Sequence, residues 1–333
     1  MLNFTFLGTS SGVPTLSRNV SGLAIGLDKS KDWILVDAGE GTQQRIQQAR
    51  LSLQQLKAIC ITHVHGDHCY GLIGLLASAG MNARKQALTL IAPQAIQDWL
   101  NITAQLTDLY LPYPIEFIDV ETLLEQPHQL SEMLSIQTHR LHHRVPSYAF
   151  SLRASRSQQK LDSEALKTLG VPKGKAWGDL QNGQDIEFNG QILNSQQFLS
   201  TSTQQVHAIV AGDNDQPELL HTACATADVL IHEATYTQDV LDKVGTAPMH
   251  SSAKMLATFA EQAQLAQLIL THLSARYHDA KGSEKIKKEV QQFYSGKFWL
   301  AHDFDQYHLD ADGKLTQTAQ AQHAFAQPTS TDE

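Results

Sequence analysis

Short apolar runs that stop at a polar residue recur along this chain. The runs at residues 33–36, 58–62, 208–212, 229–231 and 268–271 are rich in Ile, Leu, Val and Ala. Continuous apolar runs of this length predict strands that are buried on both faces of a sheet. The residues that follow the runs are Asp37, His63, Asp213, His232 and His272. Polar side chains at these places lie on the rim of the sheet, where α/β proteins place ligands and chemistry.

Helical patterns alternate with the apolar runs. They cover residues 41–50, 71–80 and 251–264, and the third carries Met255 and Phe259 at helical spacing. Strands and helices interleave to about residue 300, with no repeat of fixed period and no long linker. We therefore expect one layered α/β domain over residues 1–315.

Two segments depart from this alternation. Residues 153–185 are polar, with Gly170 and Gly174 near the middle, and carry six basic residues against four acidic ones. We interpret them as an inserted arm with a short helix. Residues 316–333 are polar and of low complexity, and we expect a disordered tail there.

Composition narrows the class of protein. The chain has 333 residues, of which 42% are hydrophobic and 18% charged, which is typical of a globular protein. No apolar run reaches the ~18 residues that a membrane span needs. Three cysteines without a CxxC pair favour a reducing compartment, so we expect a cytoplasmic protein. The net charge of −9 argues against non-specific coating of nucleic acid.

Histidine is unusually abundant, with 16 residues, and its densest cluster has the spacing of a metal site. Residues 63–68 read HVHGDH and directly follow a predicted buried strand. His63 and His65 point to the same side of an extended segment, and a turn at Gly66 lets Asp67 and His68 face a second position. One loop can therefore supply two neighbouring metal ions. This ligand mix suits Zn²⁺, with Mn²⁺ or Fe²⁺ as alternatives.

Four residues cannot complete two metal sites, so further ligands must come from elsewhere in the chain. His143, Asp213 and His272 are the natural candidates. Alone, each would more often have a capping or structural role. An aspartate offers two anionic oxygens and can bridge two cations, which favours Asp213 for that position.

Several motifs together resemble one family. HVHGDH is similar to the HxHxDH signature of the metallo-β-lactamase superfamily. The segments at residues 6–19, 37–42, 232–236 and 268–277 resemble, in order and spacing, those of the tRNA 3′-processing endonucleases called ribonuclease Z. The resemblance runs from residue 4 to about 280. It implies an αββα sandwich in which two mixed sheets lie face to face, with helices outside and metals at one edge.

The resemblance also implies a ligand set and two zinc ions per chain. His63, His65 and His143 would hold one ion, Asp67, His68 and His272 the other, and Asp213 would bridge them. His143 is preferred over His142 because residues 143–148 resemble the family's His-x-x-Pro-Ser-Tyr/Phe stretch.

The resemblance also implies that Glu233 and His250 form a pair close to the leaving oxygen, and the chemistry of phosphodiester hydrolysis agrees with roles for these two side chains and for Asp67. Two metals about 3.5–4 Å apart lower the pKa of a bound water toward about 7. Asp67 can orient and deprotonate that water, and His250, held protonated by Glu233, can donate a proton to the departing 3′-oxygen. A purely structural hydrogen bond between Glu233 and His250 is the alternative. For Arg276, a contact to a substrate phosphate and a structural ion pair both remain open.

The predicted arm indicates the kind of substrate. Residues 169–178 resemble the family's Leu-Gly-Val-Pro-x-Gly-Pro-Leu-Tyr-Gly, and in the family an inserted arm grips the tRNA elbow. Lys173 and Lys175 are the candidate contacts, although Lys175 replaces the family's proline. An arm that holds tRNA far from its own metals favours a homodimer in which one subunit holds the tRNA that its partner cuts.

The sequence therefore favours an endoribonuclease that cuts precursor tRNA on the 3′ side of the discriminator base. It would leave a 3′-hydroxyl on the tRNA and a 5′-phosphate on the trailer, and it would bind neither DNA nor a membrane. A small-molecule phosphodiesterase or sulfatase-like hydrolase of the same superfamily is the alternative. A non-catalytic RNA-binding scaffold is disfavoured, because all seven ligand positions are filled.

Overall fold

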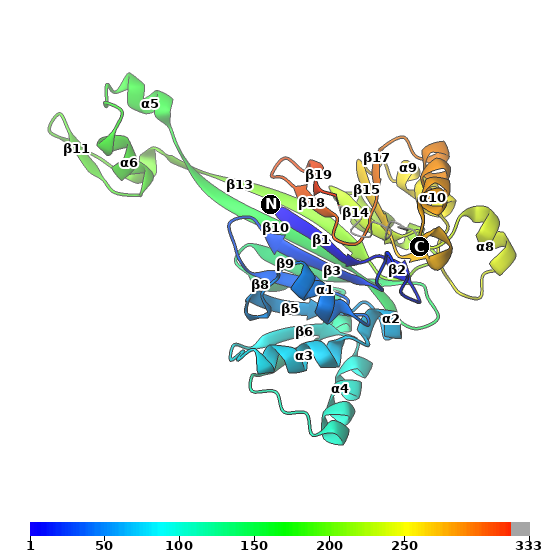
Figure 1. Ribbon diagram of the computed structural model, residues 1–333. Coiled ribbons are helices and arrows are strands. Elements are labelled where there is room, and N and C mark those ends of the chain that lie inside the picture. The colour runs from blue at the N-terminus through cyan, green and yellow to red at the C-terminus, as the bar shows by residue number, and fades with distance from the viewer. Residues whose placement is uncertain (321–333) are drawn as a thin grey trace, which may run out of the picture. The chain divides into compact units, whose positions relative to one another are not determined.

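The predicted apolar runs form the strands of two mixed sheets (Figure 1). The protein is described by a computed structural model covering residues 1–320. The eight-stranded sheet has the order β19-β18-β1-β3-β4-β5-β6-β7, and β4 to β7 are parallel. Its strands are β1 Leu2–Gly8, β3 Gly22–Leu27, β4 Trp33–Val36, β5 Leu56–Cys60, β6 Leu88–Ala92, β7 Ile115–Asp119, β18 Gln306–Leu309 and β19 Leu315–Ala319.

The second sheet has seven strands in the order β17-β15-β14-β13-β10-β9-β8. Strands β13, β14, β15 and β17 are parallel, whereas β8, β9 and β10 are antiparallel neighbours. The strands are β8 His128–Ser131, β9 Leu134–Leu141, β10 Ser147–Leu161, β13 Leu199–Ala211, β14 Val229–Glu233, β15 Gln267–Thr271 and β17 Lys297–Leu300. A small parallel pair, β2 Ser10–Ser11 with β16 Leu273–Ser274, lies outside both sheets.

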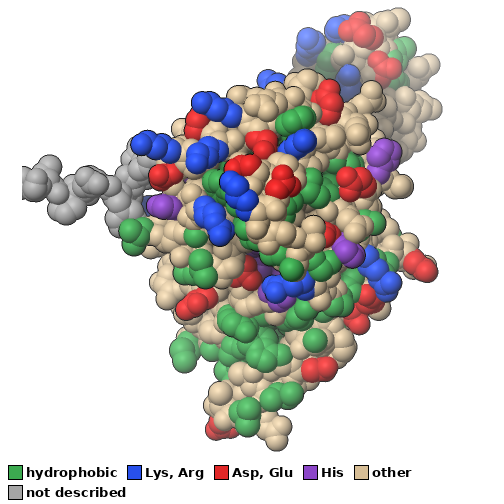
Figure 2. Space-filling view, turned by 90° about the vertical axis from the view of Figure 1, so that its right-hand side faces the viewer, with side chains coloured by type: hydrophobic (Ala, Val, Ile, Leu, Met, Phe, Trp, Pro, Cys, Tyr) green, Lys and Arg blue, Asp and Glu red, His purple; other side chains and the backbone are tan. Residues whose placement is uncertain are grey.

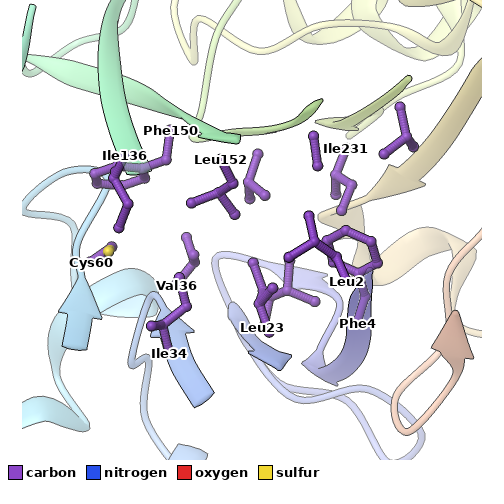
Figure 3. Close-up of a cluster of buried hydrophobic side chains, with 14 of the residues drawn as sticks. Leu2, Phe4, Leu23, Ile34, Val36, Cys60, Ile136, Phe150, Leu152 and Ile231 are labelled. Atoms are coloured by element: carbon purple, nitrogen blue, oxygen red, sulfur yellow. The ribbon is translucent and has the colours of Figure 1, made fainter. Parts of the chain in front are cut away.

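Apolar side chains of the two sheets meet in the central core (Figure 3). Phe4 and Ile34 from the first sheet and Ile136, Phe150 and Leu152 from the second belong to the same buried cluster and are at most 2% exposed. Removal of this apolar surface from water is the main force that holds the sheets face to face.

Helices cover the outer faces of both sheets. α1 Thr42–Gln48, α3 Leu72–Met81 and α4 Gln94–Thr107 pack on the first sheet, and α9 Ala253–Gln262 and α10 Ala280–Phe293 pack on the second (Figure 1). The αββα sandwich is therefore confirmed. The remaining helical turns are α2 Gly66–Cys69, α5 Ser163–Thr168, α6 Lys175–Gln181, α7 His221–Cys224, α8 Gln238–Val244, η1 Leu53–Gln55, η2 Val120–Leu123, η3 Ser195–Gln197, η4 Pro217–Leu220 and η5 Ala275–Tyr277.

A second compact unit spans Ser155–Gln205. It contains α5, α6, a hairpin of β11 Ile186–Phe188 and β12 Gln191–Leu193, and the distal parts of β10 and β13. Its own apolar cluster joins Leu166 and Leu180 to Phe198. The predicted arm, residues 153–185, ends too early, because Phe198 and the hairpin complete this small core after the polar stretch has ended.

The predicted tail also begins too early. Residues 315–319 form β19, which pairs antiparallel with β18. Leu315 is buried, and its backbone N–H donates to Gln267 Oε1 at 2.7 Å, so side-chain burial and pairing order a segment that its composition marks as polar. The rest of the predicted tail, residues 321–333, lies outside the described residues.

Within residues 1–320, every helix is too short or too polar to cross a membrane.

Candidate metal centre and active site

The ends of several strands bring the predicted site residues to one edge of the sandwich. His63 lies shortly after β5, Asp213 after β13 and His272 directly after β15, while Asp67 and His68 lie on α2. The loop between β9 and β10 adds His143. All seven predicted ligands fall into groups whose potential ligand atoms lie within 4.8 Å of one another.

The first group consists of three imidazoles and a carboxylate. His65 Nδ1 lies 3.2 Å from His63 Nε2 and 3.1 Å from His143 Nε2. Asp213 Oδ2 lies 3.6 Å from both His63 Nε2 and His143 Nε2. Three ring nitrogens that converge with one carboxylate oxygen form a donor set that Zn²⁺ accepts.

The second group shares the same aspartate. His68 Nε2 and His272 Nε2 lie 3.1 Å apart, and Asp67 Oδ2 lies 3.6 and 3.3 Å from them. Asp213 Oδ1 lies 3.3 Å from each of these two nitrogens. One oxygen of Asp213 thus faces each group, which is the arrangement that a bridging carboxylate needs.

Burial and charge favour the metal-binding protonation states of His63, His143 and Asp213. His68 differs: burial opposes a charge on it, but Asp213, Asp37 and Asp67 outweigh burial and raise its pKa well above the usual value. Burial lowers the pKa values of His63 and His143, so these imidazoles are neutral and their lone pairs are free. Burial alone would raise the pKa of Asp213, but its interactions with His272 and His68 outweigh burial and hold that pKa well below its usual range. Neutral imidazole and ionised carboxylate are the forms that bind divalent cations.

Hydrogen bonds fix the far sides of the His68 and His143 imidazoles. Asp37 Oδ2 accepts from His68 Nδ1 at 2.7 Å, and the same carboxylate accepts from the Thr62 amide and hydroxyl. His143 Nδ1 donates to the Met249 carbonyl at 2.8 Å. Such outer partners set the tautomer and the orientation of ligating histidines.

Three non-glycine residues at this edge have left-handed backbones. Asp37, Met249 and His272 have φ values of 62°, 56° and 55°. Each such conformation costs about 1–3 kcal/mol and persists only where the surrounding contacts enforce it. Three of the ten left-handed non-glycine residues in the described part of the chain thus carry or orient candidate ligands.

The predicted Glu233–His250 pair lies beside the shared aspartate. His250 Nδ1 is 3.1 Å from both oxygens of Glu233 and 3.7 Å from Asp213 Oδ2. Burial opposes a charge on His250, but the negative charges of Glu233 and Asp213 prevail and raise the pKa of His250 to about 9. With Nδ1 bonded to Glu233, Nε2 is the nitrogen left to donate a proton.

Sequence reasoning missed the groups that position Glu233. The Asn214 amide donates to Glu233 Oε1 at 2.7 Å, and the Thr235 hydroxyl donates to Oε2. Thr235 belongs to the HEAT-like motif at residues 232–235, so the motif could have identified it from the sequence. The Asn214 contact is made by a backbone N–H, which leaves no signal in residue type.

The predicted substrate-binding residues lie in both units. Arg276 is exposed, with its guanidinium 6.0 Å from the Tyr236 ring centroid, and Tyr236 lies 6.1 Å from the His250 ring. Among the residues that the structure describes, no carboxylate forms an ion pair with Arg276, which leaves it available to an anion. Lys173 and Lys175 are exposed on the second unit, and Lys173 Nζ lies 5.5 Å from the Trp177 ring centroid.

Comparison with known proteins gives close relatives over nearly the whole chain. Ribonuclease Z of Pseudomonas putida (strain GB-1) is 45% identical over 318 residues, which cover 94% of this chain and 99% of that protein. Ribonuclease Z of Marinobacter nauticus is 44% identical over 319 residues, covering 94% and 98%. A family model described as anti-Pycsar protein Apyc1 matches residues 2–162, less than half of the chain.

Solved structures agree with the sandwich. The short form of human tRNase Z is 25% identical with a TM-score of 0.62, covering 91% of this chain and 98% of that chain. The metallo-beta-lactamase fold protein YhfI from Bacillus subtilis is 18% identical with a TM-score of 0.63, covering 92% and 98%, and supports the fold alone. Identity of 44–45% over the full length of bacterial relatives is decisive, and this chain belongs to the ribonuclease Z family.

Proposed function

We propose that this protein is a metal-dependent endoribonuclease that matures the 3′ ends of tRNA. It would cut precursor tRNA after the discriminator base, leaving a 3′-hydroxyl on the tRNA and a 5′-phosphate on the trailer. The proposal rests on two neighbouring groups of potential metal ligands, with one oxygen of Asp213 facing each group, in a chain of the ribonuclease Z family. Membership in that family disfavours the small-molecule hydrolase.

We propose that two divalent cations, both Zn²⁺, occupy the donor groups. His63, His65 and His143 would hold one, Asp67, His68 and His272 the other, and Asp213 would touch both. Bound there, such cations would lower the pKa of a water molecule and would neutralise charge on the scissile phosphate.

The protein's own side chains complete the reaction. Asp67 Oδ2 accepts a hydrogen bond from the Gly12 amide at 2.8 Å, which holds this carboxylate in place to orient and deprotonate the attacking water. His250 donates the proton that the departing 3′-oxygen requires, and Glu233 keeps that imidazole charged and oriented.

The decisive experiment compares two substrates with and without a chelator. The purified protein should cut a precursor tRNA once, after the discriminator base, and should also hydrolyse bis-p-nitrophenyl phosphate. Both activities should stop with chelator and return with Zn²⁺. Hydrolysis of the small diester with no cleavage of precursor tRNA would overturn the proposed substrate.

Removal of the charge on Glu233 should shift the pH profile. Glu233 raises the pKa of His250, so Glu233→Gln should lower it, and the protonated acid should be lost at a lower pH. The basic limb of the kcat/KM profile, measured from about pH 6 to 10, should therefore move to lower pH. Glu218→Gln, which changes an exposed glutamate, is the matched control. An unmoved limb would mean that His250 is not the titrating acid.

A homodimer is part of the proposal. Large apolar side chains are exposed on and near α4: Ile102 is 57% exposed, Leu106 80% and Tyr110 82%. Figure 2 shows apolar side chains (green) gathered over the lower part of this face. Contiguous exposed apolar surface marks interaction sites, and a twofold pair would cover it with one self-complementary contact. Sedimentation of the purified protein tests this state.

The cytoplasm is the proposed compartment. The three cysteines, Cys60, Cys69 and Cys224, are buried and unpaired, which supports a reducing environment.

Replacing Lys173 and Lys175 by alanine should weaken the grip on tRNA. We propose that the second unit, Ser155–Gln205, which contains most of the predicted arm, binds the tRNA backbone. Phosphate contacts position a substrate without reading its sequence. The double variant should raise KM for precursor tRNA, with a shallower salt dependence, while hydrolysis of bis-p-nitrophenyl phosphate stays nearly the same. Equal losses on both substrates would make the arm structural.

A further inference from the structure

Arg144 is an exposed cation at the active-site edge that the proposed reaction does not use. It follows His143 directly in the loop between β9 and β10. His143 is a candidate ligand, and its ring lies 4.9 Å from that of His65, so the Arg144 backbone lies at the rim of the first donor group. Within residues 1–320, no carboxylate forms an ion pair with Arg144. Within the described residues, the positive charge of Arg144 is thus not neutralised by a carboxylate.

The loop that carries Arg144 is held on both sides. Before it, the His142 amide donates to Asn214 Oδ1 at 3.2 Å, and the His142 side chain makes a second contact with the loop after β13. After it, the Tyr148 amide donates to the Thr62 carbonyl at 3.1 Å, which joins the loop to the segment leading into the HVHGDH cluster. The Arg144 backbone is therefore anchored next to the donor groups, while its side chain remains in solvent.

Aromatic rings connect Arg144 to Arg276 across the site. From Arg276 the row passes to Tyr236 and then to His250, with separations of 6.0 and 6.1 Å. From His250 it continues to His143 at 5.2 Å between ring centroids, and Arg144 is the residue directly after His143. The two exposed arginines thus occupy opposite ends of one row of side chains. Figure 2 shows basic side chains (blue) next to histidines (purple) at the centre of this face.

The position of His250 in this row gives the RNA a direction. His250 protonates the oxygen that leaves with the nucleotide on the 5′ side of the cut, so that nucleotide lies at the end of the row that holds Tyr236 and Arg276. The phosphate stays with the trailer, whose next nucleotides continue toward His65 and Arg144. This step rests on the proposed function.

We propose that Arg144 binds the first phosphate of the trailer beyond the scissile one, and so positions the single-stranded 3′ segment across the site. A guanidinium suits this task because its planar fork donates two parallel hydrogen bonds to phosphate oxygens and stays charged at every physiological pH. Arg144 is therefore a positioning residue that favours substrates with a trailer of at least two nucleotides.

The test pairs a protein variant with a substrate variant. Arg144→Ala should lower kcat/KM about tenfold for a precursor tRNA with a trailer of several nucleotides, the size expected for loss of one charge-assisted hydrogen bond. Replacing the second trailer phosphate by an uncharged methylphosphonate should cost the wild-type protein a similar factor. The two changes together should cost no more than either alone, because they remove the same contact.

Two further variants separate charge, geometry and folding. Arg144→Lys should recover part of the loss, since it restores the charge without the fork. Arg140→Ala is the matched control, because that arginine on β9 already pairs with Glu121, and it should cleave like the wild-type protein. The Arg144→Ala protein should also show a shallower salt dependence, by about 0.7 in the logarithmic slope for one phosphate of a single strand.

The outcomes distinguish this inference from the proposed function. Additive losses from Arg144→Ala and the methylphosphonate, or no loss from either, would overturn the role of Arg144 while wild-type cleavage of precursor tRNA still supports the enzyme. If the wild-type protein does not cut precursor tRNA at all, the proposed function fails first, and the trailer contact fails with it.

Discussion

Asp67→Ala is expected to abolish cleavage of precursor tRNA. The change removes one candidate ligand and the candidate base together, since Asp67 Oδ2 lies 3.3 Å from His272 Nε2 and accepts from the Gly12 amide. Loss of the base alone would cost about 10²–10⁴ in rate, so the combined loss should exceed about 10⁴. Single-turnover cleavage and metal analysis of the same sample measure both effects, and metal content should fall below that of the wild-type protein.

Two measurements test whether the loss of activity comes from unfolding or from the removal of any carboxylate. Thermal unfolding should remain cooperative, because Asp67 lies at the edge of the sandwich and not in its apolar core. Asp32→Ala, which removes an exposed carboxylate in the turn before β4, should leave both activity and metal content as they are. Wild-type turnover by Asp67→Ala would assign the base to another residue.

The apolar runs predicted several core strands well because each run is a local signal, whereas the sandwich was implied by the resemblance to the family. The run at residues 33–36 is β4, and the run at 268–271 lies within β15, so the polar residue after each run reaches the same edge. His143 illustrates how a motif resolved a local ambiguity. The structure brings it to the donor groups, whereas His142 points to Asp215.

The errors in the prediction come from contacts between segments that are distant in sequence. β19 has a polar sequence, and its order depends on pairing with β18 and on the Gln267 side chain. The second unit continues to Gln205 because Phe198 completes an apolar cluster with Leu166. The composition and periodicity of a short stretch of sequence do not show which distant residues it contacts in the fold.

The arrangement around Glu233 shows the same limit at the candidate site. A motif identified the carboxylate and the imidazole, but the hydrogen bond from the Asn214 amide depends on how the loop after β13 lies against β14. The left-handed backbone of His272 is equally invisible in a sequence, since no glycine marks it. Residue types could therefore be predicted, whereas the orientation of each group required the fold.

His250→Ala should slow cleavage of precursor tRNA by about 10²–10⁴ while metal content stays at the wild-type level. The reason lies in the leaving group: a ribose 3′-oxygen departs poorly without a proton, and His250, charged through Glu233, is placed to supply it. Single-turnover rates measured with saturating protein isolate this step from product release.

A change of leaving group separates acid catalysis from a structural role. The p-nitrophenolate of bis-p-nitrophenyl phosphate departs without protonation, so the defect of His250→Ala should be much smaller on that substrate. His221→Ala, which removes an exposed histidine on α7, is the matched control and should leave both rates unchanged. His250 also belongs to a group with Asp213 and His272 that could hold a cation. Loss of metal together with equal defects on both substrates would therefore make His250 a ligand, and the acid would have to be sought elsewhere at this edge.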